Sequence, residues 1–208
     1  MSSPQALKTV DKGAQDIVYK DKGSKFLGFA KHVDNAEKAM AFFELLRKQH
    51  PGANHCCYAY RLGSEGQDVR ANDDGEPTHS AGTPILGQIQ SYELTNTALA
   101  VIRYFGGTKL GVGGLVKAYK ATAQLTLDAC RFKVEVVYQR AQLKFFYPDI
   151  GTVMHWLKQE QCTILEQDLD QNCTIEFNLP EIQIQQAANF WKSRQDILFE
   201  ILEADRGQ

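Results

Sequence analysis

A glycine-rich segment with four cations is the part of this sequence best suited to bind an anion. Residues 103–121 read RYFGGTKLGVGGLVKAYKA and hold five glycines, four Lys or Arg residues and no acidic residue. Glycines permit left-handed turns and let a backbone approach a ligand closely. The cations are Arg103, Lys109, Lys117 and Lys120. We call this segment the elbow, and its composition predicts contact with phosphate groups or with another anionic surface.

The elbow falls where a predicted strand ends and a predicted helix begins. Free amides at a helix N-terminus point outward, and the helix dipole there favours anions. With the helix expected from about Gly114 to Arg131, Lys117 and Lys120 occupy its first two turns. Cations there oppose the dipole unless an anion is bound. A tight turn with solvated lysines is the alternative interpretation.

Known nucleotide-binding motifs do not match the elbow. Thr108 precedes Lys109, whereas a P-loop needs Ser or Thr after a Gly-Lys pair. Val116 stands where a dinucleotide fingerprint needs glycine. ATP and NAD are therefore disfavoured, while a nucleic-acid backbone stays open. The candidate residues for this phosphate or nucleic-acid site are Arg103, Tyr104, Gly106, Gly107, Lys109, Gly113, Gly114, Lys117 and Lys120.

A second segment, NDDGEPTHSAGTP, gathers the carboxylates of Asp73, Asp74 and Glu76 around Gly75. Three roles are open. A hard metal ion would use oxygen ligands, but the spacing matches no EF-hand. Acid–base chemistry would pair a carboxylate with a histidine, either His55 or His79. The favoured role is a loop locked by ion pairs, for which the candidate partners are Arg61, Arg70 and Arg103. We expect no bound metal and no cofactor.

Cysteine chemistry is weakly indicated. The run His55-Cys56-Cys57 lies inside an apolar strand pattern, so at least one thiol is expected in the core rather than as a nucleophile. The five cysteines form no CxxC pair and no even set, which favours reduced thiols in a cytosolic protein.

The elements that must position these residues divide the chain into two parts. In the first, a hairpin, three further strands and three helices are expected from periodicity and turn residues. Asn35 is expected to cap the first helix, and Thr83 followed by Pro84 to start the second. The apolar centre of TNTALAVIRYF indicates a strand covered on both faces or buried centrally. The expected strands are 14–20, 24–33, 55–62, 67–73 and 95–105, and the expected helices are 35–50, 83–93 and 114–131.

The second part carries a different pattern. Alternating strands and two helices that begin near Pro148 and Pro180 follow each other in the order βαββαβ, the ferredoxin-like split motif. Charge changes at the same place, from a net +3 over residues 1–137 to −5 over residues 138–208. We therefore expect two domains, 1–137 and 138–208. A polyanion is expected to meet the first more readily.

Bulk properties limit the class of protein. A hydrophobic content of 43% in 208 residues supports packed cores. No apolar run approaches the roughly 18 residues of a membrane span, and the N-terminus lacks the apolar segment of a secretion signal. We expect a cytoplasmic protein that does not enter membranes.

Three stretches resemble a known family. NDDGEPTHSAGTPIL, VIRYFGGTKLGVGGLVKAYKATA and HCCYAYRL, with their spacing, are similar to the signatures of the IMPACT family, also called the YigZ or UPF0029 family. The resemblance covers most of residues 15–135, and the remainder looks like the small C-terminal domain of bacterial members. Thr78-His79-Ser80 departs from the smaller residues found in many members, which puts a family role for His79 in doubt.

The resemblance implies an α+β fold. The N-terminal domain is expected to be a two-layer α/β sandwich like the second domain of ribosomal protein S5, and the C-terminal domain a ferredoxin-like domain as in a translocase elongation factor. It also implies a link to translation control. Eukaryotic members restrain a starvation-sensing kinase through protein contacts, and bacterial members are suspected to bind nucleic acid or the ribosome.

We therefore predict a non-catalytic, translation-associated binding protein that uses the elbow. Its expected partner is RNA, the ribosome or an acidic face of a protein. The alternative is an enzyme acting on a phosphorylated substrate, with Asp73, Asp74 or Glu76 as base or metal ligand. His55 and Arg61 are expected as supporting residues of the site. Ion pairs from these carboxylates to Arg61 or Arg103 would count against the enzyme.

Overall fold

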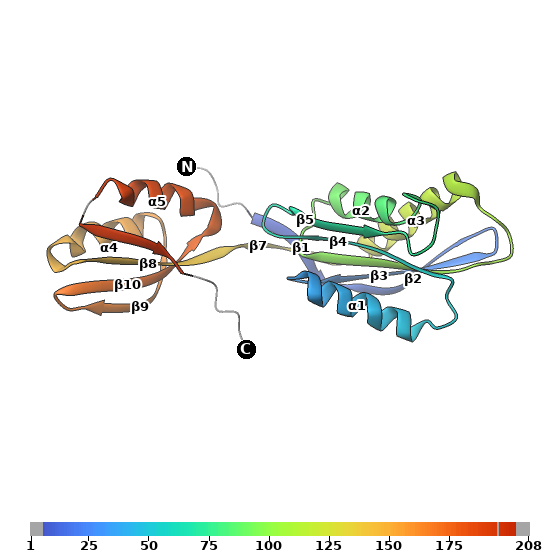
Figure 1. Ribbon diagram of the computed structural model, residues 1–208, viewed down its shortest axis with the longest axis horizontal. Helices are drawn as coiled ribbons and strands as arrows, with labels where there is room; N and C mark the ends of the chain where they lie inside the picture. Colours follow the sequence, from blue (N-terminus) through green and yellow to red (C-terminus); the bar gives the residue numbers. More distant parts are fainter. Residues whose placement is uncertain (1–5, 195, 203–208) are drawn as a thin grey trace. The chain divides into compact units, whose positions relative to one another are not determined.

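The computed structural model describes residues 6–194 and 196–202. The chain forms two compact units, which divide between Glu135 and Val136 (Figure 1). We call Leu7–Glu135 the first unit and the part that begins at Val136 the second unit. Helices and strands both contribute extensively, so the expected α+β class is confirmed. No helix among the described residues is long and apolar enough to cross a membrane.

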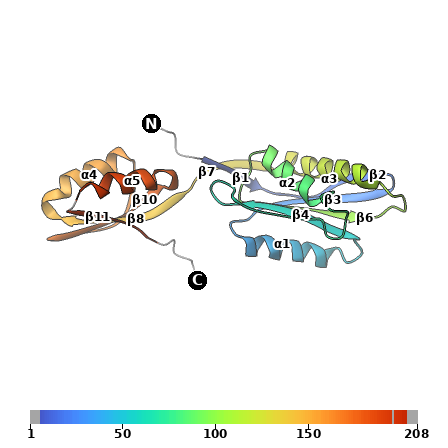
Figure 2. The ribbon, with the colours of Figure 1, turned by 45° about the horizontal axis from the view of Figure 1, so that its top comes forward.

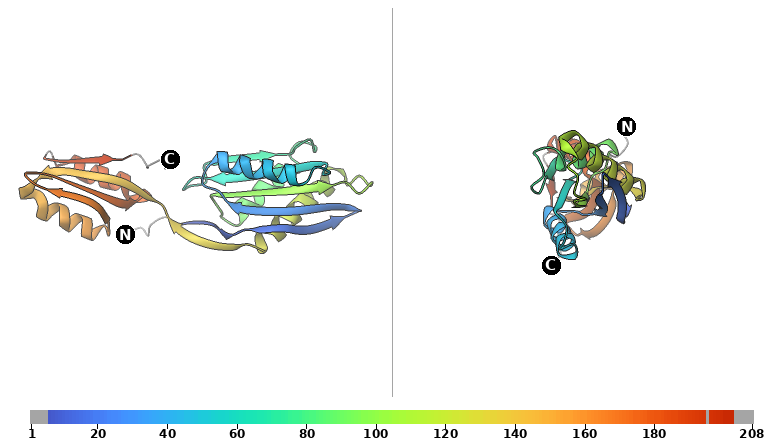
Figure 3. Two further views of the ribbon diagram at one scale, coloured as in Figure 1. Left: turned by 90° about the horizontal axis from the view of Figure 1, so that it is seen from below. Right: turned by 90° about the vertical axis from the view of Figure 1, so that its right-hand side faces the viewer.

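A five-stranded antiparallel sheet forms the centre of the first unit. Its strands are β2 (Ala14–Asp21), β3 (Ser24–His32), β4 (His55–Leu62), β5 (Asp68–Asn72) and β6 (Thr97–Tyr104). The order across the sheet is β2-β3-β6-β4-β5. The apolar strand β6 therefore lies at the middle of the sheet, as its sequence indicates. Figure 3 (left) shows these strands side by side, with α1 in front of the half that contains β4.

Helices cover both faces of this sheet. The helix α1 (Ala36–Gln49) packs on one face, whereas α2 (Gly82–Ser91) and α3 (Gly111–Asp128) pack on the other (Figure 2). The expected two-layer sandwich thus gains a third layer. The physical reason is β6, whose side chains are buried on both faces from Thr97 to Arg103 and need apolar cover on both sides.

The side chains on the two faces of β6 belong to two separate apolar clusters. Leu99 and Val101 pack with α2 and α3, while Ala100 and Ile102 pack with α1. Asn35 caps α1 by accepting a hydrogen bond from the amide of Lys38 at 2.8 Å, as predicted.

A short two-stranded sheet of β1 (Ala6–Lys12) and β7 (Arg131–Val136) was not anticipated. The helix expected through Arg131 ends at Asp128 instead. In β1, Leu7 and Val10 are buried, so tertiary packing rather than a strong local pattern selects this strand.

The second unit has the predicted βαββαβ order. Its sheet runs β11-β8-β10-β9, the strand order of a ferredoxin-like domain. One apolar cluster fills it and includes both tryptophans, Trp156 and Trp191. The elements are β8 (Tyr138–Phe146), α4 (Ile150–Gln159), β9 (Thr163–Leu169), β10 (Asn172–Pro180), α5 (Ile184–Lys192) and β11 (Ile197–Ile201), with 3-10 turns at Tyr147–Asp149 and Glu181–Gln183.

Candidate functional site

The elbow residues that follow β6 are held by Asn54, just before β4, and by the β2–β3 turn. The amide of Phe105 donates to Asn54 Oδ1 at 2.8 Å, and the amide of Gly106 donates to Ser24 Oγ at 3.2 Å. Gly106 lies so close to the turn that a Cβ on it would be 1.9 Å from the carbonyl carbon of Gly23. Beyond this contact, Gly107 has a φ of +86° and open space around it, so the elbow turns outward there.

The helix α3, which begins within the elbow, starts earlier than expected. It starts at Gly111 rather than Gly114, because Leu110 and Leu115 are buried and fix the first turn against the core. No side chain caps this N-terminus, and no acidic residue lies in its first turn. Lys117 consequently lies in the second turn and Lys120 in the third. The helix dipole therefore acts only weakly on both lysines, because its interaction with a charge falls off within the first turn.

The three lysines of the elbow are available to a partner. Lys109, Lys117 and Lys120 are exposed, and none has an ion-pair or hydrogen-bond partner among the described residues. Three unpaired cations on one loop and the helix that follows it give this part of the surface a positive potential.

Arg103 differs from these lysines. Its residue is only 5% exposed, and its Nη1 lies 2.6 Å from Glu76 Oε1. Its Nη2 reaches Ser24 Oγ at 3.4 Å, and its guanidinium lies 5.5 Å from the ring centroids of both Phe26 and Phe105. Arg103 is therefore placed to position the elbow rather than to contact a ligand at the surface.

Tyr104 is directed away from the elbow. Its ring packs against the α1-side cluster, and its hydroxyl lies 2.8 Å from Nδ1 of His50. Of the two adjacent aromatic residues, only Phe105 is exposed, at 45%.

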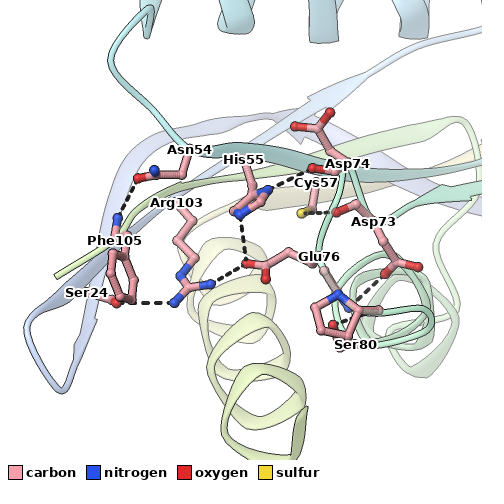
Figure 4. A network of polar contacts seen from close by, with 12 residues as sticks. Ser24, Asn54, His55, Cys57, Asp73, Asp74, Glu76, Ser80, Arg103 and Phe105 are labelled. Carbon is pink, nitrogen blue, oxygen red and sulfur yellow. Dashed lines mark hydrogen bonds and ion pairs between the residues drawn. The ribbon is translucent and has the colours of Figure 1, made fainter. Parts of the chain in front are cut away.

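Glu76 joins the acidic loop to both ends of the elbow. Its side chain is 4% exposed, and its Oε1 accepts hydrogen bonds from Arg103 Nη1 and from the Tyr119 hydroxyl at 2.7 Å. Arg103 lies at the β6 end of the elbow, and Tyr119 lies at its α3 end. His55 Nε2 lies 3.9 Å from the same oxygen. The two segments thus meet through a buried polar contact, as Figure 4 shows, and the favoured arginine ion pair exists at Glu76.

Arg61 has a different role from the one expected. It lies opposite Thr97 near the end of β4, whereas His55 pairs with Arg103 at the other end. Its guanidinium donates to backbone carbonyl oxygens rather than to a carboxylate, and these belong to Glu65, Gly66 and Leu94. Arg61 therefore stabilises the loop between β4 and β5, at the opposite end of β4 from His55 and the acidic loop.

Asp73 caps the N-terminus of helix α2, although it lies eight to nine positions before it in the sequence. Its carboxylate accepts hydrogen bonds from the amides of His79 at 2.9 Å, Ala81 at 2.9 Å and Gly82 at 2.8 Å. The expected cap at Thr83 is wrong, because α2 already begins at Gly82. Burial acts to raise the pKa of Asp73, but the three amide hydrogen bonds outweigh it and lower this pKa.

Replacing Asp73 by alanine is expected to destabilise the first unit by about 1–2 kcal/mol at neutral pH, as for loss of an N-cap. Because the folded-state pKa is lowered, this stabilisation is present above the ordinary aspartate pKa near 4 and is lost as pH falls through the folded value. Urea unfolding of both proteins at several pH values measures it. A stability difference that stays constant down to pH ~2 would contradict the ionised cap.

Asp74 also has partners within the first unit. Its Oδ2 accepts a hydrogen bond from the amide of Cys56 at 2.6 Å and forms an ion pair with Arg47 of α1. Its carbonyl oxygen lies 2.8 Å from His55 Nδ1. Sequence reasoning missed Arg47, because nothing local links a helix C-terminus to a loop 27 positions away.

The thiols next to His55 are not prepared for nucleophilic chemistry. Burial raises the pKa of Cys56 to about 11 and raises that of Cys57 as well. Cys57 Sγ lies 3.0 Å from the carbonyl oxygen of Asp73 and 3.3 Å from the Tyr119 hydroxyl. A thiolate is the reactive form, so both cysteines fit the core role that the strand pattern indicates.

Two further lysines lie beside the elbow without any sequence signal. The β2–β3 turn that packs against Gly106 contains Lys22, and Lys25 follows it on β3, opposite Tyr104 in the register. Both are exposed. They are missed in the sequence because the contact between this turn and the elbow spans 82 positions and depends on the pairing of β3 with β6.

The arrangement is thus a rigid, open and basic loop above a buried polar anchor. Within the described ranges, no group of three or more His, Cys, Asp or Glu residues is placed to hold a metal ion. The chemistry that the exposed groups offer is electrostatic recognition of an anion.

Comparison with known proteins gives the family. The model described as the Impact N-terminal domain matches residues 22–127. An IMPACT family member of Haemophilus influenzae is 31% identical over 166 residues, which cover 79% of this chain and 81% of the relative. The Escherichia coli member YigZ is 41% identical over 117 residues, 53% of this chain and 57% of the relative. A crystal structure of a hypothetical protein, 27% identical, has a TM-score of 0.67 and covers 97% of this chain and 98% of its own. The chain belongs to the IMPACT family.

Proposed function

We propose that this protein is a non-catalytic regulator of translation that binds nucleic acid, on the ribosome or as free RNA, through the elbow. Membership of the IMPACT family supports the setting in translation. The observation that carries the binding role is the state of Lys109, Lys117 and Lys120, all exposed and without a partner among the described residues. The open backbone at Gly107, Gly111 and Gly113 leaves room for a phosphate chain beside them.

The alternative of an enzyme acting on a phosphorylated substrate is less well supported. Each carboxylate of the acidic loop already has partners: Asp73 has three amides, Asp74 has an amide and Arg47, and Glu76 has Arg103 and Tyr119. A general base must reach a substrate proton, and Glu76 is buried. These contacts favour a structural role for the loop.

Reversing two of the lysine charges tests the proposed function. We expect Lys109→Glu/Lys117→Glu to weaken binding of single-stranded RNA by more than about tenfold, since two phosphate contacts become repulsive. If three lysines contact phosphates, the slope of log affinity against log salt is about −2 for the wild type, and its magnitude is expected to fall below about 1 in the variant. Filter binding over a range of salt concentrations measures both quantities.

The matched control is Lys31→Glu/Lys158→Glu. It makes the same change in net charge at two exposed lysines outside the elbow, on β3 and α4. We expect it to retain most of the affinity. Equal RNA affinity in both double variants would contradict the site. Binding to a lysate protein that depends on the elbow lysines and persists after nuclease treatment would instead identify an acidic protein partner.

A further inference from the structure

Phe105 is an aromatic side chain left exposed at the point where the elbow turns outward. It is 45% exposed, although burying a phenylalanine fully contributes about 1.5–3 kcal/mol. Its neighbours Arg103 and Tyr104 are directed inward, to Glu76 and to His50 respectively. The chain therefore presents this one ring at the start of the basic loop.

The backbone that carries the ring is fixed by hydrogen bonds and by a close backbone contact. The Phe105 amide is fixed by Asn54, and the next residue is fixed by Ser24 and by its backbone contact with Gly23. The guanidinium of Arg103 lies 5.5 Å from the ring centroid. A ring fixed in this way loses little conformational freedom when a planar ligand stacks on it.

Lysines lie on both segments that meet beside Phe105, the elbow and the β2–β3 hairpin. Lys109 follows it in the elbow, and Lys22 and Lys25 lie on the β2–β3 hairpin whose turn packs against Gly106. A rigid aromatic surface among lysines matches the way proteins bind single-stranded nucleic acid, with bases on rings and phosphates on cations. A base inside a duplex is not free to stack on such a ring.

We propose that Phe105 stacks on a base and makes the elbow select single-stranded RNA over duplex RNA. This inference rests on the proposed function, because it adds a base contact to the lysine contacts. It assigns the selectivity for single-stranded RNA to Phe105, a residue that carries no charge. It also predicts that anions without bases bind independently of Phe105.

The test compares Phe105→Leu and Phe105→Tyr with the wild type. The probes are a single-stranded RNA of about 12 nucleotides, an RNA duplex of the same length, and inorganic polyphosphate. We expect Phe105→Leu to weaken single-strand binding about 5- to 150-fold, the range of one lost base stack. Phe105→Tyr retains a ring and is expected to remain near wild type. Duplex and polyphosphate binding should change by less than about twofold in both variants, since the lysines are unaltered.

Each outcome decides between the two proposals. Unchanged single-strand affinity in Phe105→Leu, while Lys109→Glu/Lys117→Glu still weakens binding more than about tenfold, overturns the stacking role and leaves the proposed function intact. An equal loss on all three probes overturns it too, because it indicates a disturbed elbow. No wild-type binding to RNA or polyphosphate, or binding to poly-glutamate alone, overturns both.

Discussion

Replacing Glu76 by alanine is expected to lower the free energy of unfolding of the first unit by about 3–5 kcal/mol. The change leaves Arg103, whose side chain is 6% exposed, as a buried charge without its carboxylate. Arg103 already has one buried nitrogen, Nε, without a hydrogen-bond partner. The substitution of Glu76 also removes the acceptor of the hydrogen bond from the buried Tyr119 hydroxyl. Because whole domains are stable by only about 5–15 kcal/mol, this is among the largest single effects available in the chain.

Urea unfolding followed by far-ultraviolet circular dichroism measures this loss. The matched control is Asp34→Ala, which breaks the exposed ion pair with Lys38 and is expected to change stability by less than about 1 kcal/mol. The double variant Glu76→Leu/Arg103→Met removes both charges and is expected to recover much of the loss. If the double variant is no more stable than Glu76→Ala, the unpaired charge is not the cause.

Replacing Gly106 by alanine is the second change with a large expected effect. The added Cβ would lie 1.9 Å from the carbonyl carbon of Gly23, 2.1 Å from its oxygen and 2.3 Å from the nitrogen of Ser24. All three are backbone atoms, so no side-chain rotation relieves the clash. We expect a loss of about 2–3 kcal/mol or more, together with displacement of the β2–β3 turn. Urea unfolding and the amide chemical shifts of residues 22–24 measure the two effects.

Gly113→Ala is the control for this prediction. Gly113 lies inside α3 with nothing within 4 Å of the added Cβ and without a positive φ. Alanine favours a helix more than glycine does, so we expect a gain of about 0.5–1 kcal/mol. Two glycines of one elbow should thus respond with opposite signs. Similar losses at both positions would show that the elbow needs glycine for its own flexibility rather than for the contact with the turn.

Local patterns predicted much of the fold. The cap at Asn35, the doubly covered β6 and the βαββαβ order follow from side-chain chemistry and periodicity within one element. The start of α3 did not follow, because three glycines argue against helix while the burial of Leu110 and Leu115 overrides them. Intrinsic propensity is a weak guide where packing fixes a turn.

The partners within the candidate site depended on contacts that no local pattern encodes. The sequence suggested an arginine for Glu76, but it offered three, and sheet register selects Arg103 by placing it opposite His55. The same register brings Lys25 beside Tyr104 and the β2–β3 turn against Gly106. The capping of α2 by Asp73 likewise acts across eight to nine positions of irregular loop.

The placement of both tryptophans in the core of the second unit has an experimental consequence. Trp156 and Trp191 are the only tryptophans of the chain, and both lie in the apolar cluster of that unit. Intrinsic tryptophan emission is therefore a reporter of the second unit alone, whereas circular dichroism sums both units. In Glu76→Ala and Gly106→Ala, the emission transition should keep its wild-type midpoint while part of the dichroism transition moves to lower urea. Each variant thus carries an internal reference for its own unfolding.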